Sequence, residues 1–331
     1  MKTFLTALAA SLVLAPAALA QVPTTPTTPA APAPAPAPAP QSAKMSVHVV
    51  GASIDHGTRY FVAGQRISVA GTITPFVEGE RVTVVLYRGK RIASRKKVTT
   101  KKSGNKGAFS VAFPVRKAGS YSVRAYHKAS AGQQKATTKK VAFRAFVGKA
   151  GGGSHGAKVR LLQRSLARMG YVTSRGGRYD GATSCAVLAY RKVNGMGRNG
   201  FASKAVFLKA LKGRGTFKLR YPRAGKHVEF DWSRQVLVLA SGGRAQRIYH
   251  ASSGKPSTPT VFGTFHFYRK QPGTNSHGMV YSNYFIRGYA IHGYASVPNY
   301  AASHGCIRVP IPNAVSIYRW VNLGNPIFVY R

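Results

Sequence analysis

Apolar and polar side chains alternate along four stretches of residues 45–147, and this period of two constrains the fold more than any other feature. In a β-strand successive side chains point to opposite faces, so each stretch has one buried face. Glycine-containing turns separate the stretches. Short strands at this spacing predict an immunoglobulin-like β-sandwich over residues 45–147. The alternating residues are Ile67, Val69 and Ile73, then Val82, Val84 and Leu86, then Phe109, Val111 and Phe113, and finally Tyr121, Val123 and Ala125.

The pattern changes to a helical one after a flexible joint at residues 151–154. Apolar residues at a spacing of three and four predict a first helix that ends at Gly170. A second helix is predicted up to Tyr190 with Thr183 as its cap, and a third over 203–211 with Ser203 as its cap. Residues 155–213 are therefore expected to form a small three-helix unit. The apolar positions of the first helix are Val159, Leu162, Leu166 and Met169.

The N-terminus has the features of an export signal. Lys2 precedes an apolar run, and Ala18-Leu19-Ala20 is a small-residue cleavage site, so residues 1–20 are expected to be a signal peptide. A retained membrane anchor is the alternative. Residues 21–43 are rich in Ala-Pro repeats, which favour an extended linker. The protein is thus expected to be secreted to the cell wall or the periplasmic space.

The charge balance is extreme, because 50 Lys and Arg face only 6 Asp and Glu, giving a net charge of +44. Such a surface attracts polyanions in a salt-sensitive way. An exported protein meets anionic cell-wall polymers rather than chromosomal DNA. We therefore predict anionic wall polymers as partners and no nucleic acid. A role in solubility alone is the other interpretation of the charge.

Residues 216–331 are rich in strands, with one helix expected over 313–321, and carry the pattern with chemical meaning. His292 is followed later in the chain by Ser303-His304-Gly305-Cys306 and Arg308. A thiol needs a neighbouring imidazole to react at neutral pH, so a Cys with a distant His is a candidate acyl-transfer pair. The absence of a Cβ at Gly305 lets a reacting carbonyl approach, and the N–H groups of Gly305 and Cys306 are candidate oxyanion donors.

Three other interpretations apply to this pattern. Cys306 is an ordinary core residue in the first. In the second, His292, His304 and Cys306 bind zinc, although their spacing matches no common zinc pattern. In the third, Cys306 forms a disulfide with Cys185, which the placement of the two cysteines in separate predicted domains disfavours.

Two parts of the chain resemble known families. Residues 216–331 resemble the L,D-transpeptidase catalytic domain of the YkuD type, and residues 155–213 resemble the type 1 peptidoglycan-binding domain. The first resemblance is carried by Ile291-His292-Gly293, Ser303-His304-Gly305-Cys306-Ile307-Arg308, Ser253-Gly254-Lys255, Thr258-Pro259-Thr260 and Gly263-Thr264-Phe265. The second is carried by Leu162-Gln163, Gly170-Tyr171, Tyr179-Asp180 and Ala186-Val187.

The resemblance implies a multidomain, mainly β protein with a catalytic β-sandwich whose nucleophilic Cys lies at the end of a strand. It implies no metal and no organic cofactor. Peptidoglycan stem peptides and glycan strands are the implied partners, and β-lactams of the carbapenem type the implied covalent inhibitors. The segment 279–285 matches the family's substrate lid. The implied catalytic residues are Cys306, His292 as base, His304, Gly305 and Gly293, and the implied substrate-binding residues are Arg308, Ser303, Tyr281 and Met279.

The implied reaction is the formation of 3→3 cross-links through a thioacyl enzyme with release of D-Ala. Nearby cations are expected to lower the pKa of the Cys306 thiol below that of a free thiol. Two alternatives remain at this stage. One is an L,D-carboxypeptidase that uses water as acceptor, and the other is a wall-binding protein without catalysis.

Overall fold

The computed structural model describes residues 39–331. The expected signal peptide and residues 21–38 of the expected linker lie outside the described residues. Within 39–331 the fold is mainly β, and no helix of this part is long and apolar enough to cross a bilayer.

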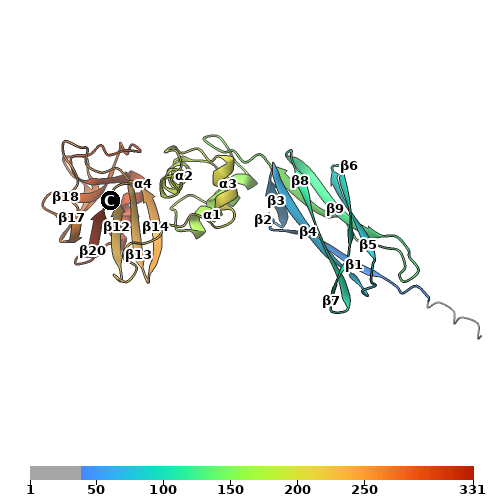
Figure 1. The fold of residues 1–331 in the computed structure, drawn as a ribbon. Coiled ribbons are helices and arrows are strands. Elements are labelled where there is room, and N and C mark those ends of the chain that lie inside the picture. Colours follow the sequence, from blue (N-terminus) through green and yellow to red (C-terminus); the bar gives the residue numbers. More distant parts are fainter. Residues whose placement is uncertain (1–38) are drawn as a thin grey trace, which may run out of the picture. The chain divides into compact units, whose positions relative to one another are not determined.

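Two antiparallel-rich sheets pack on one hydrophobic core in the N-terminal part (Figure 1). One sheet has the order β1-β4-β8-β7 and the other β2-β3-β11-β9-β5-β6, with β10 beside β9. Val69 and Phe113 come from the first sheet and Val84 and Val123 from the second, and all four are buried as their alternation predicts. The strands are β1 (Lys44–Val50), β2 (Ser53–Asp55), β3 (Thr58–Val62), β4 (Gln65–Thr74), β5 (Arg81–Arg88), β6 (Arg91–Thr99), β7 (Lys101–Ser103), β8 (Lys106–Val115), β9 (Gly119–His127), β10 (Ala136–Thr137) and β11 (Val141–Phe146).

Three helices follow: α1 (Ala157–Arg168), α2 (Gly181–Val193) and α3 (Lys204–Ala210). The predicted cap of α2 is wrong. Asp180 is the N-cap and its carboxylate accepts from the Thr183 N–H, because a carboxylate three residues earlier reaches the free amides of the first turn. Ser203 caps α3 as predicted.

The C-terminal part contains two more sheets, with the orders β14-β13-β12-β20-β15 and β16-β17-β18-β19. They enclose a second core in which Phe230 and Leu239 of the first sheet meet Ile291 and Ile307 of the second. The one helix here begins at Ile311 rather than Asn313, because Pro312 suits the first turn. The elements are β12 (His227–Asp231), β13 (Val236–Ser241), β14 (Arg244–His250), β15 (Gly263–His266), β16 (Arg269–Thr274), β17 (Val280–Ile286), β18 (Tyr289–Tyr294), β19 (Ile307–Pro310), α4 (Ile311–Trp320) and β20 (Pro326–Tyr330).

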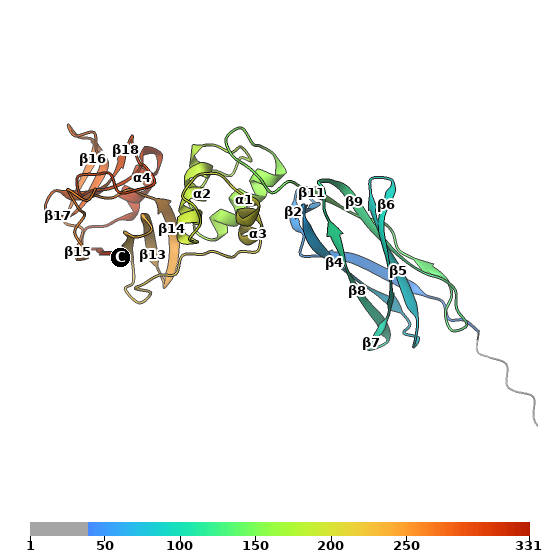
Figure 2. The same ribbon diagram turned by 45° about the horizontal axis from the view of Figure 1, so that its top comes forward.

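The three helices do not form a core of their own. Val159, Leu162 and Tyr190 belong to the same buried cluster as Val236 of β13 and Ile248 of β14. Helix α2 lies beside β14 (Figure 2). The helices thus cover the apolar outer face of β13 and β14, where Val236 and Ile248 lie.

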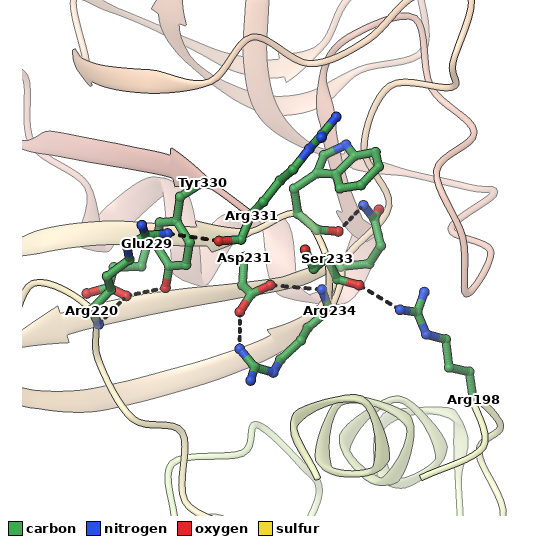
Figure 3. A network of polar contacts seen from close by, with 10 residues as sticks. Arg198, Arg220, Glu229, Asp231, Ser233, Arg234, Tyr330 and Arg331 are labelled. Atoms are coloured by element: carbon green, nitrogen blue, oxygen red, sulfur yellow. Dashed lines mark hydrogen bonds and ion pairs between the residues drawn. The ribbon is translucent and has the colours of Figure 1, made fainter. Parts of the chain in front are cut away.

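Two of the few acidic residues, Glu229 and Asp231, each accept several hydrogen bonds from backbone amides and side chains nearby in space. Glu229 is fully buried and accepts hydrogen bonds from the Arg220 and Tyr221 amides and from the Tyr330 hydroxyl (Figure 3). Burial raises the pKa of the Glu229 carboxyl, but a hydrogen bond from the His227 ring together with these donors holds it below its usual value. Asp231 accepts from the amide and guanidinium of Arg234. With so few carboxylates, most of the Lys and Arg residues have no acidic partner.

Candidate active site

The parallel pairing of β18 with β19 places the predicted catalytic residues on one face. Ile291 pairs with Ile307 and His292 with Arg308. Because side chains alternate along a strand, Ile291 and Ile307 enter the core while His292 and Arg308 point to the other side. Cys306 lies directly before β19 and two positions before Arg308, which is the spacing of side chains on one face of a strand. The family resemblance implied a cysteine at the end of a strand, whereas the structure places it at the beginning of one.

The loop before Cys306 is held by hydroxyl groups. Ser303 is 1% exposed; its Oγ accepts from the Gly305 N–H at 3.1 Å and donates to the Cys306 carbonyl at 2.5 Å. Thr260 Oγ1 donates to the Gly305 carbonyl at 2.7 Å and accepts from the Gly254 N–H at 2.9 Å. Ser303 therefore shapes the loop from inside. The Gly305 N–H, expected as an oxyanion donor, is already engaged by Ser303.

Gly305 has a conformational reason to be glycine. Its φ of +116° lies in a region that L-residues rarely adopt, and a Cβ there would lie 2.1 Å from a ring carbon of Tyr289. The Tyr289 ring thus occupies the space that a side chain would need. This backbone constraint was not part of the sequence argument, which considered only access for a substrate.

His292 is held as a neutral base. Its ring is 3% exposed, and Nδ1 lies 2.9 Å from the Gly293 carbonyl. A carbonyl only accepts, so Nδ1 carries the proton and Nε2 is the basic nitrogen. Burial and the charge of Arg308 lower the pKa of His292 to about 4, and the Gly293 carbonyl opposes this shift.

Burial also raises the pKa of the Cys306 thiol above its usual value, which contradicts the expected lowering. A backbone hydrogen bond from Ala290 and the charge of Arg308 act in the other direction but do not overcome burial. The thiol lies 3.8 Å from the Gly288 carbonyl, an acceptor that favours the protonated form. The resting pair is therefore a neutral thiol and a neutral imidazole, not an ion pair.

A cavity of about 320 Å³ opens over these groups. Its wall contains no carboxylate, and the guanidinium of Arg308 is held 4.1 Å from the centre of the Tyr294 ring. An anionic ligand would meet the guanidinium of Arg308 here. The lining residues are His277, Met279, His292, Tyr294, Ser303, His304, Cys306 and Arg308.

Comparison with known proteins agrees with this geometry. The model of the YkuD family, the L,D-transpeptidase catalytic domain, matches residues 225–329. The solved structure of the L,D-transpeptidase from Xylanimonas cellulosilytica (residues 123–326) is 33% identical, and the match covers 55% of this chain and 97% of that one with a TM-score of 0.51.

The chain belongs to the L,D-transpeptidase family.

Among curated proteins, L,D-transpeptidase 1 of Mycobacterium tuberculosis is 31% identical over 123 residues, which are 29% of this chain and 47% of that protein. The chain thus spans about half the length of the curated relative it matches. The structure of L,D-transpeptidase 3 from M. tuberculosis with a faropenem-derived adduct is also similar, at 18% identity over 32% of this chain and 60% of that one, with a TM-score of 0.30.

The other predicted site residues of this family member fall into two groups. Met279 and His304 line the cavity, and His304 is exposed. Tyr281 does not line it, since its ring packs against Tyr318 of α4 at a centroid distance of 5.3 Å. Its positive φ of 52° turns the chain within β17, the strand that forms most of the expected lid. Gly293 packs tightly on Ala314, where a Cβ would come within 2.8 Å.

Sequence reasoning missed two cavity residues, His277 and Tyr294. Tyr294 lies two positions after His292 in β18, so the period of a strand was a sufficient signal for it. His277 lies in the turn before β17, where no periodicity applies.

Both cysteines are free, as the sequence argument favoured over a disulfide. Within residues 39–331 no group of three or more His, Cys, Asp or Glu side chains is placed to hold a metal ion.

Proposed function

We propose that this L,D-transpeptidase forms 3→3 cross-links in peptidoglycan through a thioacyl intermediate on Cys306. The observation that supports this most is the tautomer of His292. The Gly293 carbonyl holds the proton on Nδ1, so the free lone pair of Nε2 belongs to a ring that shares one cavity with the thiol.

The first half-reaction begins with a substrate in the cavity. The Cys306 thiol gives its proton to Nε2 of His292 while sulfur attacks the carbonyl at the L-centre of diaminopimelate in a donor tetrapeptide. The tetrahedral oxyanion then collapses, the bond to D-Ala breaks, and the imidazolium gives its proton to the departing amine. Arg308 supports thiolate formation, because its charge lowers the pKa of the thiol.

The second half-reaction transfers the acyl group. The side-chain amine of a second diaminopimelate attacks the thioester and gives a proton to His292, and the thiol is restored when the carbon–sulfur bond breaks. The guanidinium of Arg308 would bind a carboxylate of the stem peptides. The backbone amides of His304 and Cys306 are our candidates for the oxyanion site.

The test is incubation of the protein with disaccharide tetrapeptide, followed by mass analysis of the products. We expect a dimer that has lost one D-Ala. Cys306→Ala is the control; it should give no product while its thermal melt coincides with that of the wild type. Turnover by Cys306→Ala near the wild-type rate would disprove the proposal.

The same experiment separates the two alternatives. A tripeptide monomer with loss of D-Ala and no dimer would indicate an L,D-carboxypeptidase that uses water as acceptor. Unchanged substrate, together with binding to isolated walls, would indicate a wall-binding protein without catalysis.

A strained acyl donor provides a second probe of the nucleophile. We propose that a carbapenem acylates Cys306, because its ring carbonyl undergoes the same attack by sulfur. Peptide mapping should find one adduct on Cys306, which shares its cavity with His292, and none on Cys185.

The setting of the reaction is part of the proposal. Residues 1–20 would direct export, and the net charge of +44 would retain the protein among anionic wall polymers. We further propose that residues 155–213 bind peptidoglycan while also covering the catalytic sheet.

A further inference from the structure

A lysine is buried between the helices and the catalytic sheet. Lys192 of α2 is 4% exposed, and its ammonium has three acceptors within reach. These are Nδ1 of His250 at 2.8 Å, the Gln235 carbonyl at 3.0 Å and the Ala251 carbonyl at 3.2 Å. An ammonium has three N–H donors, so its hydrogen bonds are complete without a carboxylate. A buried cation satisfied in this way fixes the positions of all three acceptors.

His250 connects Lys192 to a loop near the candidate nucleophile, because its second ring nitrogen makes a hydrogen bond to that loop. Its Nε2 lies 2.9 Å from the Val297 carbonyl, which only accepts, so Nε2 carries the proton and Nδ1 accepts from Lys192. Val297 belongs to the 295–306 loop, defined here as the segment between β18 and β19 that ends with Cys306. Lys192 is thus connected to this loop through one imidazole ring.

A second contact joins the same loop to the segment after α2. Arg198 donates to the Asn299 carbonyl at 3.3 Å, and Asn299 Nδ2 donates back to the Arg198 carbonyl at 2.7 Å. The other guanidinium nitrogen donates to the Ser233 carbonyl at 2.6 Å (Figure 3). The helical segment therefore contacts the 295–306 loop directly through Arg198 and indirectly through His250 of β14.

The two carbonyl acceptors of Lys192, those of Gln235 and Ala251, are also connected to the 295–306 loop, through Ser253. Ala251 precedes Ser252 and Ser253, and the Ser253 carbonyl accepts from the Ala302 and Ser303 amides, both at 2.8 Å. Gln235 in turn holds Ser253, with its amide nitrogen on the Ser253 hydroxyl at 2.8 Å.

We propose that Lys192 is a positioning residue that holds the 295–306 loop, and with it Cys306, in the geometry of the active site. Its meaning for catalysis rests on the function proposed above, whereas its effect on the loop does not. The helices before the catalytic sheet are then part of the catalytic unit as well as a candidate binding module.

The charge state of Lys192 provides a specific readout. Burial and the neighbouring charge of Arg198 lower the pKa of Lys192 to about 7, and the Cys185 thiol on α2 has a smaller opposite effect. His250 of β14 faces the ammonium directly. Below pH 7 the ammonium donates three hydrogen bonds; above it the amine keeps two, so the hold on the loop weakens.

The experiment is hydrogen exchange of the full chain, read by peptide masses over pH 5–9. In Lys192→Met we expect peptides of the 295–306 loop to exchange roughly tenfold faster at pH 6, since a buried charged donor is lost. Peptides of β12 and β20 should not change. The wild-type loop should loosen above pH 7 after correction for intrinsic exchange, and Lys192→Met should lack this step. Lys218→Met is the matched control, because Lys218 is exposed.

His250→Leu is the second variant, for the case that Lys192→Met does not fold. It removes the hydrogen bond to Val297 together with the Nδ1 acceptor of Lys192, so the loop should loosen while the ammonium keeps its two carbonyl acceptors. Equal acceleration in all peptides, or a loop indistinguishable from that of Lys218→Met, would overturn the proposal. Because exchange needs no substrate, a failure of the proposed transpeptidation would leave this result intact.

Discussion

At the scale of single residues, burial decides the protonation states of the site. His292 is buried and Cys306 is partly buried, and burial drives each toward its neutral form. In the proposed mechanism, proton transfer from the thiol to the imidazole would then occur once substrate is bound rather than beforehand. Arg308 is the one nearby charge that acts on both groups, which makes it a target for experiments.

The acid limit of catalysis should reflect the unusual pKa of His292. The base must be neutral to accept a proton, and its pKa lies at about 4. We therefore expect kcat/KM to stay high down to about pH 5 and to fall near pH 4, and not near the 6.5 of a free imidazole. A pH–rate profile with disaccharide tetrapeptide measures this. An acid limb centred near 6.5 would mean that His292 is not the base.

The same group makes stability depend on pH. Its folded pKa of about 4 lies below the unfolded value of 6.5, so the unfolded chain binds more protons between these values. Stability is then fully present above about pH 6.5 and falls as the pH drops toward 4. Urea melts across this range should show the decline, and His292→Gln should reduce its slope.

Replacing Arg308 should make the thiol less reactive. Its charge favours the thiolate, so Arg308→Met should raise the pKa of Cys306 further and slow alkylation by iodoacetamide at pH 8. The rate at Cys306, followed by peptide mass mapping over pH 6–10, measures the shift. Arg244→Met is the control, since Arg244 is an exposed arginine of β14. Identical profiles for the two variants would contradict the role given to Arg308.

At the scale of elements, packing against β18 and against residues 258–260 determines the shape of the 295–306 loop near Cys306. Thr260 and Tyr289 contact it from outside, and the Ser303 hydroxyl makes hydrogen bonds within it. Such a loop has little freedom to absorb an added atom.

Gly305→Ala should therefore disturb the loop. The new methyl would meet the Tyr289 ring at 2.1 Å and the backbone would be strained at φ +116°. We expect a loss of roughly 1–3 kcal/mol in stability and a large loss of turnover. Gly288→Ala is the matched control, because a methyl group at Gly288 would have no atom within 4 Å and the φ there is ordinary. Thermal melts and turnover of both variants decide the matter; equal behaviour would show that the loop tolerates a side chain.

At the scale of the whole molecule, charge and the shared core act together. With 50 basic and 6 acidic residues, attraction to anionic walls is expected to dominate association. Removal of residues 155–213 would uncover Val236, Val238 and Ile248, so a truncated chain is a poor test of wall binding. Intact protein is the appropriate material.

We expect retention on isolated walls to fall steeply with salt. The screening length shortens from about 10 Å at 0.1 M to about 3 Å at 1 M, which removes most long-range attraction. Sedimentation of walls with the intact protein at both concentrations measures it. Walls stripped of their anionic polymers are the control and should retain less protein at low salt. A fraction that persists at 1 M salt would be evidence for a specific peptidoglycan site.

The sequence alone predicted the alternating strands and the helical segment, and it singled out residues of the cysteine motif that the structure places around one cavity. These rest on local periodicity and on residue types at short spacing, which need no knowledge of the fold. One local detail was wrong: the sequence predicted Thr183 as the cap of α2, whereas Asp180 caps it.

Only the tertiary structure decided the electrostatics and the partners of the site. The pKa of Cys306 follows from its burial, and the close approach of Gly305 to the Tyr289 ring joins the loop before β19 to β18. The link from Lys192 to His250 spans 58 residues and two elements that local patterns treat as separate domains. Such contacts are set by the packing of the whole chain, because no periodicity within one segment records which surface another segment will cover.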